Sequence, residues 1–385
     1  MPRHPGPAAQ TAAMPGAIYS ALADKIAQID GPIFPLHVGD TFMEPVEGSR
    51  MENLSVADHP GMHRYTRPQG HADLVDALLE KCRSRNGLPV ERAGITVTAG
   101  ATAGLAAAIG AICDPGDEVL ILAPFWPLIR GHVQCFRAKP VEVPFYDRVD
   151  SLEAAVEAVR QRITPRSVAL YVSTPSNPTG VVLPEDWLRA LADLAREHDL
   201  WLLSDETYED YAFRGKHVSI GAFAPERTIT AFSFSKAYGM AGNRVGYLAA
   251  PAEVSGQIRK ISSHTYFSAP TGGQLGALFA LRNGQAWIDR AHALYKAAGD
   301  DAADVLGVPR PAGSTFLFLN LESQLDERGV FGFLEDCLDD GLLLAPGPSF
   351  GVDYASWVRV CFTSAPPEAV ADAVRRLARR VRPQG

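Results

Sequence analysis

Short apolar runs alternate with helical patterns through the middle of the chain. The first run is Ile95–Thr98, which a glycine turn and a helical pattern over 103–112 follow. Further apolar runs cover residues 117–122, 141–143, 168–172, 201–203, 228–232 and 245–248. Strands that alternate with helices form a mainly parallel sheet with helices on both faces, and such a sheet binds its ligand at the carboxyl ends of the strands. We therefore expect an α/β fold with its site at that edge.

The regions before and after these runs show mostly helical patterns. Residues 1–16 are rich in Pro and Ala and are predicted to form a mobile arm. Helices are expected over residues 17–29, 71–85, 251–264, 271–281 and 285–305. A strand, a helix and a second strand are expected over 315–319, 330–338 and 357–362. The long helical pattern before them is therefore expected to lead into a second unit.

The composition narrows the class of protein without naming a function. The 385 residues are 46% hydrophobic, which suffices for a large core, and the length indicates two domains or one with a satellite. The net charge of -8 provides no basic surplus for nucleic acid or a membrane surface. Five cysteines without a C-x-x-C pair argue against a disulfide framework or a zinc site. Because no apolar run approaches the roughly 18 residues of a membrane span, we expect a cytoplasmic protein.

The stretch Ser233–Gly246 reads SFSKAYGMAGNRVG and carries the strongest chemical signal. A lysine amine such as that of Lys236 forms Schiff bases with carbonyl compounds, and a serine hydroxyl with the fork of Arg244 can hold a phosphate dianion. A lone Ser-x-x-Lys would be explained more readily by a surface turn. The glycines of this stretch, however, let the backbone approach a phosphate closely. The pattern therefore favours a covalently bound, phosphate-bearing aldehyde.

A second candidate for the same phosphate is the turn after the first strand. The order strand, glycine turn and helix around Gly100, Ala101 and Thr102 directs backbone N–H groups and a helix dipole toward an anion. The same order also occurs as a simple connection. Because Ser233 and Arg244 are available for the same ligand, we favour a phosphate site.

The stretch Ser233–Gly246 resembles, at every position, the pyridoxal-phosphate attachment signature of class I/II aminotransferases of fold type I. The resemblance extends in order and at similar spacing from about Leu36 to Phe362. It implies a large domain with a mainly parallel seven-stranded sheet sandwiched by helices, plus a smaller α+β domain. The large domain is expected over residues 45–284, and the small domain over 1–44 and 285–385.

The resemblance also implies how the cofactor, pyridoxal 5'-phosphate, is held. Lys236 would bind its aldehyde, and the freed amine would then be the general base for the α-proton of the substrate. Asp205 would pair with the pyridine nitrogen, Tyr208 and Asn177 would reach the ring oxygen, and Trp126 would stack on the ring.

The phosphate would be bound by residues from two subunits. Ser233, Arg244 and the turn Gly100–Thr102 come from one subunit, and Tyr65 would reach across from its neighbour. The resemblance therefore predicts a homodimer with shared active sites.

For the substrate, the resemblance assigns Arg359 to the α-carboxylate and places Gly39, Asn177 and Phe350 nearby. No second arginine stands at a motif position that would mark a dicarboxylate specialist. Four phenylalanines could line an apolar pocket or belong to the core: Phe34, Phe42, Phe316 and Phe350. We therefore expect a neutral or aromatic amino donor.

Several of these residues also have purely structural interpretations. Gly39 could be a turn glycine, Tyr65 a capping aromatic, Trp126 a packing residue, Asp205 a helix cap and Arg359 a solvated arginine of an edge strand.

The predicted activity is transfer of an amino group between an L-amino acid and a 2-oxo acid. Lyases, synthases, cyclases and oxidases share the same constellation and remain the alternative, because the motifs orient the cofactor and leave the fate of the carbanion to the pocket. A non-catalytic regulator is disfavoured, because too few residues precede Leu36 to build a DNA-binding module and the charge is unsuited to DNA.

Overall fold

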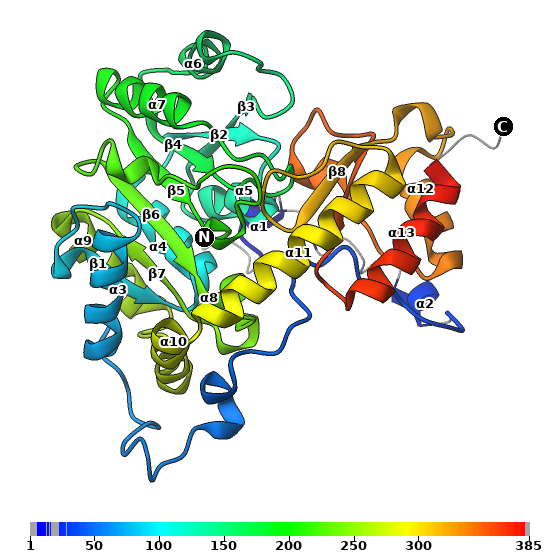
Figure 1. Cartoon of the computed structure of the whole chain (residues 1–385). Helices are drawn as coiled ribbons and strands as arrows, with labels where there is room; N and C mark the ends of the chain where they lie inside the picture. The colour runs from blue at the N-terminus through cyan, green and yellow to red at the C-terminus, as the bar shows by residue number, and fades with distance from the viewer. Residues whose placement is uncertain (1–5, 13, 15, 17–22, 28, 382–385) are drawn as a thin grey trace.

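A seven-stranded sheet forms the centre of the larger part of the molecule (Figure 1). The structure is a computed structural model that describes residues 6–12, 14, 16, 23–27 and 29–381. The strand order is β1-β7-β6-β5-β4-β2-β3. The strands are β1 (Ile95–Thr98), β2 (Glu118–Ala123), β3 (Lys139–Pro144), β4 (Ser167–Ser173), β5 (Trp201–Asp205), β6 (Thr228–Ser233) and β7 (Gly246–Ala249). Each of the apolar runs from Ile95 onward in the central region is a strand of this sheet.

The register of the strands brings the ends of β4, β5 and β6 to one edge. Ser173 lies opposite Asp205, and Asp205 lies opposite Ala231 in parallel pairs. Strand β7 alone is antiparallel to its neighbours, β1 and β6. Its first residue, Gly246, therefore lies opposite Ser233 at the end of β6. The segment that precedes β7 therefore reaches the same edge as the ends of the parallel strands.

Helices cover both faces of the sheet, as the alternation of its apolar side chains requires. The helices of this part are α3 (Ala72–Ser84), α4 (Gly100–Ile112), α5 (Pro127–Cys135), α6 (Leu152–Arg160), α7 (Glu185–Glu197), α8 (Phe234–Ala237), α9 (Ala252–Thr265) and α10 (Thr271–Asn283). Val119 and Ile121 pack on the side of α4, α5 and α9, whereas Leu120 and Leu122 pack on the side of α6 and α7.

A three-stranded antiparallel sheet, with the order β8-β10-β9, is the centre of the smaller part (Figure 1, right). Its elements are β8 (Phe316–Asn320), α12 (Gly329–Cys337), β9 (Ala345–Pro346), β10 (Trp357–Cys361) and α13 (Pro367–Val381). The long helix α11 (Gln285–Leu306) runs between the two parts and packs against α13. The N-terminal segment joins the smaller part, because Phe34 bridges to Leu342 and the Leu36 carbonyl accepts the Cys361 N–H at 2.8 Å.

The observed architecture confirms the predicted fold class, a seven-stranded, mostly parallel sheet between helices with a smaller α+β part. The domain boundaries at residues 45–284, 1–44 and 285–385 stay a prediction. The helix expected over residues 17–29 and the arm over 1–16 lie partly outside the described residues, which contain short helices at α1 (Ala9–Ala12) and α2 (Ala23–Ile26). Among the described residues, no helix combines the length and apolarity needed to cross a membrane.

Candidate active site

A cavity of about 140 Å³ lies at the carboxyl ends of β5 and β6. Its position agrees with the rule for parallel α/β sheets. The residues that line it are Ala101, Thr102, Leu105, Trp126, Asn177, Asp205, Thr207, Tyr208, Ser233, Ser235, Lys236, Ala241 and Arg244. The fold thus gathers most of the predicted cofactor residues, from six separate segments of the chain, around one space.

Lys236 lies in the short helix α8, directly after β6, and its side chain is largely buried. Its Nζ donates a hydrogen bond to the Gly39 carbonyl and lies 3.7 Å from Oδ1 of Asp40. Burial lowers the pKa of this amine, and the negative charge of Asp40 opposes that shift. A lysine with a lowered pKa can act as a nucleophile or as a base near neutral pH.

Asp205 ends β5 as a buried carboxylate, held on both oxygens. Tyr171 donates to Oδ2 at 2.7 Å, and the Thr207 hydroxyl donates to Oδ1 at 2.7 Å. Burial raises the pKa of Asp205, and the hydrogen bonds from Thr207 and Tyr171 counteract that rise. The hydrogen bonds therefore favour an anion that is available to pair with a cationic ring nitrogen.

Tyr208 stands three residues after Asp205. Its side chain is buried and packs edge-on against Phe316, with ring centroids 5.6 Å apart. Burial raises the pKa of its hydroxyl, so that the group stays protonated and can donate a hydrogen bond. Trp126 follows the carboxyl end of β2, at the same edge of the sheet and immediately before α5, and its indole packs edge-on against His132. Both aromatic side chains face the cavity that Asp205 also lines.

The turn at the start of α4 and the Arg244 side chain form one end of the cavity. Gly100 has φ +77°, and a Cβ atom at this position would collide with the Arg244 guanidinium. Nη1 of Arg244 donates to the Ala241 carbonyl at 2.9 Å. Ser233 caps α8 by accepting the Ser235 N–H at 3.0 Å, and both serines line the cavity. Hydroxyls, a guanidinium and the N-terminus of the 13-residue helix α4 thus converge, as an anion site requires.

Arg359, in β10 of the smaller part, is a buried cation without a carboxylate partner among the described residues. Nη1 donates to Oδ1 of Asn177 at 2.8 Å and Nη2 donates to the His37 carbonyl at 2.6 Å, while Nε is buried and has no hydrogen-bond partner. The rings of Phe316 and Phe350 lie 4.2 Å and 4.9 Å from its guanidinium carbon. Burial lowers the pKa of Arg359, so that an incoming carboxylate would relieve an unfavourable charge.

The segment around Gly39 completes the substrate side of the site. A Cβ atom at Gly39 would approach the Phe316 ring to 2.7 Å, so that only glycine lets the backbone pass here without displacing the ring. Gly39 contacts Lys236 through its carbonyl and Arg359 contacts Asn177, so that both residues lie beside the cavity. Of the other predicted apolar residues, Phe42 packs on Tyr295 and Phe34 lies under Arg376, each away from the cofactor cavity.

Among the predicted cofactor residues, Tyr65 is the one whose side chain is exposed on the surface of the single chain, away from the cavity. Its side chain is 88% exposed and packs edge-on against Phe267, with ring centroids 5.0 Å apart. It does not line the cavity of its own chain.

The residues fit a ligand that carries a phosphate, an aldehyde and a pyridine nitrogen. The Arg244 guanidinium lies directly against Gly100 at the start of α4, Asp205 offers a buried carboxylate, and Lys236 offers an amine with a lowered pKa. Pyridoxal phosphate has these three features. Within the described part of the chain no group of three or more His, Cys, Asp or Glu side chains could hold a metal ion.

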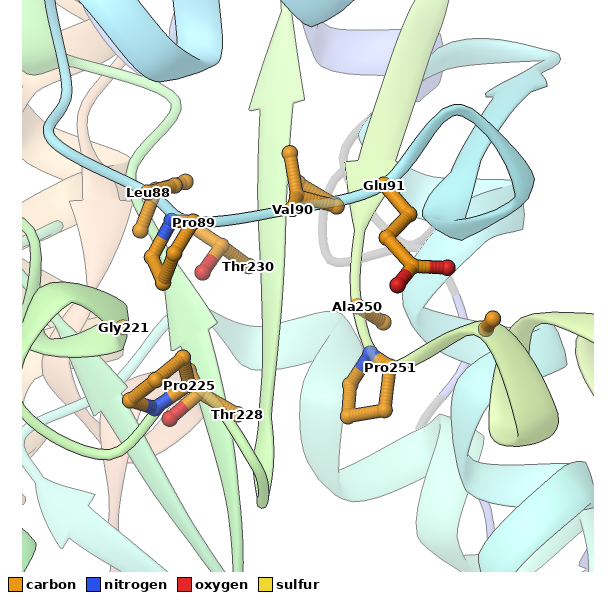
Figure 2. A pocket seen from close by; sticks show the side chains of 12 residues that line it. Leu88, Pro89, Val90, Glu91, Gly221, Pro225, Thr228, Thr230, Ala250 and Pro251 are labelled. Carbon is orange, nitrogen blue, oxygen red and sulfur yellow. The ribbon is translucent and has the colours of Figure 1, made fainter.

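A larger cavity, of about 260 Å³, lies at the other end of the sheet (Figure 2). Thr228, the first residue of β6, and Ala249, the last of β7, belong to its lining. Glu91 is the only ionisable side chain among its lining residues. A single carboxylate among prolines, alanines and threonines offers no acid–base pair, so that the smaller cavity is the candidate active site despite its size.

Among the residues of the site that sequence reasoning missed, four contact predicted site residues directly. Tyr171 bonds to Asp205, Thr207 holds the other oxygen of that carboxylate, Asp40 lies beside Lys236, and the His37 carbonyl binds Arg359. A hydroxyl-bearing ring within an otherwise aliphatic strand was a usable signal for Tyr171. A charged residue next to a candidate glycine was a usable signal for Asp40.

Comparisons with known proteins agree with this geometry. The pattern of the family described as aminotransferase class I and II matches residues 33–377. The chain is 37% identical to a probable aspartate/prephenate aminotransferase of Thermus aquaticus over 75% of this chain and 77% of that protein. It is 30% identical to the aromatic-amino-acid aminotransferase 2 of Thermococcus litoralis, over 92% and 93% of the two chains. A double mutant of Thermus thermophilus aspartate aminotransferase has a similar structure, with a TM-score of 0.89, 32% identity and coverage of 98% of this chain and 100% of that one.

Proposed function

Because the chain belongs to the class I and II aminotransferase family and is a pyridoxal-phosphate-dependent aminotransferase, we propose that Lys236, Asp205 and Arg359 carry its reaction. The further assignments concern the remaining side chains of the site, the amino donor and the assembly.

The observation that carries this assignment is the buried, incompletely bonded guanidinium of Arg359. An unpaired buried cation is unfavourable, and its unbonded Nε makes it ready for the α-carboxylate of an amino acid. Asn177 and the His37 carbonyl fix two of its nitrogens, so that the fork is oriented before the substrate arrives.

Lys236 Nζ is the group that would remove the α-proton. Its burial lowers the pKa and favours the neutral amine, the form that accepts a proton. The bound cofactor supplies an electron-withdrawing ring that stabilises negative charge on the α-carbon. Asp205 would hold the pyridine nitrogen, Tyr208 and Asn177 the ring oxygen, and Trp126 the ring face.

Ser233, Ala101, Thr102 and the Arg244 guanidinium would bind the phosphate, with Gly100 leaving room for their approach. Gly39 and Phe350 would shape the substrate side of the site. The protein would act as a homodimer in which Tyr65 completes the phosphate site of the neighbouring subunit, and the 88% exposure of its side chain supports this placement.

The amino donor is proposed to be neutral or aromatic. Lys236 and Arg244, the cations that line the cavity, are both committed to the cofactor in this assignment, which leaves Arg359 for one carboxylate. The similarity to an aromatic-amino-acid aminotransferase supports the same preference. A cytoplasmic location is inferred as well, in keeping with five cysteines that are all free.

A half-reaction with each amino acid tests this function. The purified holoenzyme is mixed with one donor, and the cofactor absorbance, the released 2-oxo acid and ammonia are measured together. Release of one 2-oxo acid per site, with loss of the original absorbance and its return on addition of a 2-oxo acid, is the expected result. Release of ammonia with persistent absorbance would instead indicate a lyase or an oxidase.

A further inference from the structure

The segment over residues 205–211 contacts the cofactor cavity with two side chains and the lysine with a third. Asp205 and Tyr208 line the cavity, and Tyr211 donates its hydroxyl to the Lys236 carbonyl at 2.7 Å. Asp205 and Tyr208 are assigned to the cofactor ring, and Lys236 to its aldehyde. A displacement of this one segment would therefore move the ring relative to the reacting amine.

Glu209 belongs to the same segment, but its side chain lies outside the cofactor cavity and is buried against α3. Nζ of Lys81, in α3, donates to Oε1 of Glu209 at 2.6 Å, and the two side chains are only 9% and 8% exposed. Nδ2 of Asn86, which follows α3, donates to the other carboxylate oxygen at 2.6 Å. Lys81 Nζ also lies 4.7 Å from the centroid of the Phe232 ring in β6. Lys81 thus connects the segment to α3 and to the end of β6.

The ion pair of Lys81 with Glu209 differs from a surface ion pair in its burial. Burial acts to raise the pKa of Glu209, but the charges of Lys81, His217 and Arg85 together outweigh burial, so that the pKa is lowered. Arg85 makes a second ion pair to the segment, with Asp210, but 40% of its side chain is exposed and its charge is more strongly screened. Lys81 therefore provides the better shielded of these two charged contacts between α3 and the segment.

We propose that Lys81 is a positioning residue for the reaction, which holds the cofactor-contacting segment against α3 through its ion pair with Glu209. The inference rests on the proposed function, because Asp205 and Tyr208 receive their roles there. Lys81 does not itself line the cofactor cavity. Its effect on the reaction must therefore pass through the residues that it contacts.

Lys81→Met and the double variant Lys81→Met/Glu209→Met test the proposal, because both lack the ion pair and only the first leaves a buried charge unpaired. Two measurements compare each holoenzyme with the wild type. Visible circular dichroism of the bound cofactor depends on the orientation of its ring, and a single-turnover half-reaction at varied donor concentration gives the maximal rate.

We expect altered dichroism in both variants, together with a maximal rate that is lower by about tenfold or more. The donor concentration at half-maximal rate should change little. Arg359, which is assigned to the donor carboxylate, is held by Asn177 and the His37 carbonyl instead of by this segment.

Thermal unfolding of the same proteins separates positioning from stability. The double variant should be more stable than Lys81→Met and yet remain slow, because it has no unpaired buried charge but still lacks the ion pair. If the pair only stabilised the fold, rate and stability would recover together. A double variant with the dichroism and the maximal rate of the wild type would therefore overturn the proposal, even where Lys81→Met does not fold.

Arg380→Met is the matched control, since it removes the cation of a partly buried ion pair, with Asp340, in the smaller part of the molecule. It should leave both the dichroism and the maximal rate unchanged. The dichroism also separates this inference from the proposed reaction. If the wild type binds the cofactor but transfers no amino group from any donor, and the dichroism still changes in both Lys81 variants, the proposed reaction fails and the positioning role stands.

Discussion

At the scale of single residues, burial decides what each ionisable group of the site can do. Asp205, Lys236 and Arg359 are ordinary residue types whose pKa values are all shifted by desolvation. The sequence identified these types at the right spacing, because their pattern resembles a known signature. It gave no information on the partners, such as Tyr171, that set how far each group departs from its behaviour in water.

Replacement of Tyr171 by Phe should move the acidic limb of the activity profile to higher pH. The variant removes the 2.7 Å hydrogen bond that favours ionised Asp205, so that burial raises the Asp205 pKa further. A hydrogen bond to a charged group contributes about 1.5–3 kcal/mol, which corresponds to a fall in kcat/KM of about tenfold or more at the acidic side. The measurement is kcat/KM against pH, with the dissociation constant of the cofactor as a second readout.

Tyr146→Phe is the control for this prediction. The Tyr146 hydroxyl is also buried near the site, but it donates to the Ser173 carbonyl at 2.6 Å instead of to Asp205. Its loss should lower stability and leave the pH profile in place. A Tyr171→Phe profile that coincides with the wild type would show that Thr207 alone maintains the charge of Asp205.

His37 is expected to make the stability of the protein depend on pH below neutrality. Burial, reinforced by the charge of Arg359, lowers the His37 pKa from 6.5 to about 4. Between these values the unfolded chain binds a proton on this side chain and the folded protein does not. The contribution of the neutral ring is therefore fully present above pH 6.5 and is lost as the pH falls through 4.

Urea unfolding of the wild type and of His37→Asn at several pH values checks this dependence. The difference in the free energy of unfolding should be largest above pH 6.5 and should decline toward pH 4. The His37 carbonyl, which binds Arg359, is retained in the variant. A difference that stays constant across this range would contradict the lowered pKa.

At the scale of elements, the start of α4 shows how local geometry and a distant side chain depend on each other. The helix begins at Gly100, three residues before the predicted start at 103, because glycine can adopt the positive φ that turns the chain from β1 into the helix. The same glycine also leaves room for Arg244, which the antiparallel β7 brings to this edge. Sequence patterns predicted both elements, but not that they would touch.

Gly100→Ala should weaken cofactor binding by about tenfold or more, because the added methyl group would displace the Arg244 guanidinium and strain the turn. Titration of the apoprotein with pyridoxal phosphate, followed by fluorescence, measures the dissociation constant. Gly87→Ala is the matched control, since Gly87 has a similar φ of +67° but nothing within 4 Å of a new Cβ atom. If both variants bind the cofactor equally well, the contact with Arg244 does not matter for the phosphate.

At the scale of the whole molecule, the site depends on the joining of two parts of the fold. Arg359 comes from the three-stranded sheet, Asn177 from the loop after β4, and His37 from the N-terminal segment. Tyr354 donates to Asp147 at 2.6 Å, and the Val352 N–H donates to Glu142 at 2.8 Å, so that the loop after Phe350 is bound to the larger part. The position of the substrate carboxylate is therefore a property of the assembled molecule.

The proposed sharing of sites between subunits predicts complementation between two defective variants. Tyr65→Ala and Lys236→Ala should each lower activity when they are alone. After subunit exchange of an equal mixture, about a quarter of all sites should combine an intact Lys236 with the partner's intact tyrosine, and activity should recover accordingly. The assay is specific activity before and after exchange.

The mixture of wild type with Lys236→Ala serves as the reference for exchange. A Tyr65→Ala protein that binds the cofactor as tightly as the wild type, and gains nothing from exchange, would exclude the role proposed for Tyr65. The ring would then only pack against Phe267.

The sequence by itself determined the fold class, the cofactor and the identity of most side chains around the cavity. Apolar periodicity specifies strands and helices locally, and motifs such as Ser233–Gly246 are contiguous, so that both can be identified without coordinates. Only the tertiary structure decided which distant groups meet. Tyr171 with Asp205, Gly100 with Arg244, and Asp40 with Lys236 are separated along the chain by 34, 144 and 196 residues. Such pairs form because the strand order and the strand register bring their segments together. Neither the order nor the register can be predicted from a local sequence pattern.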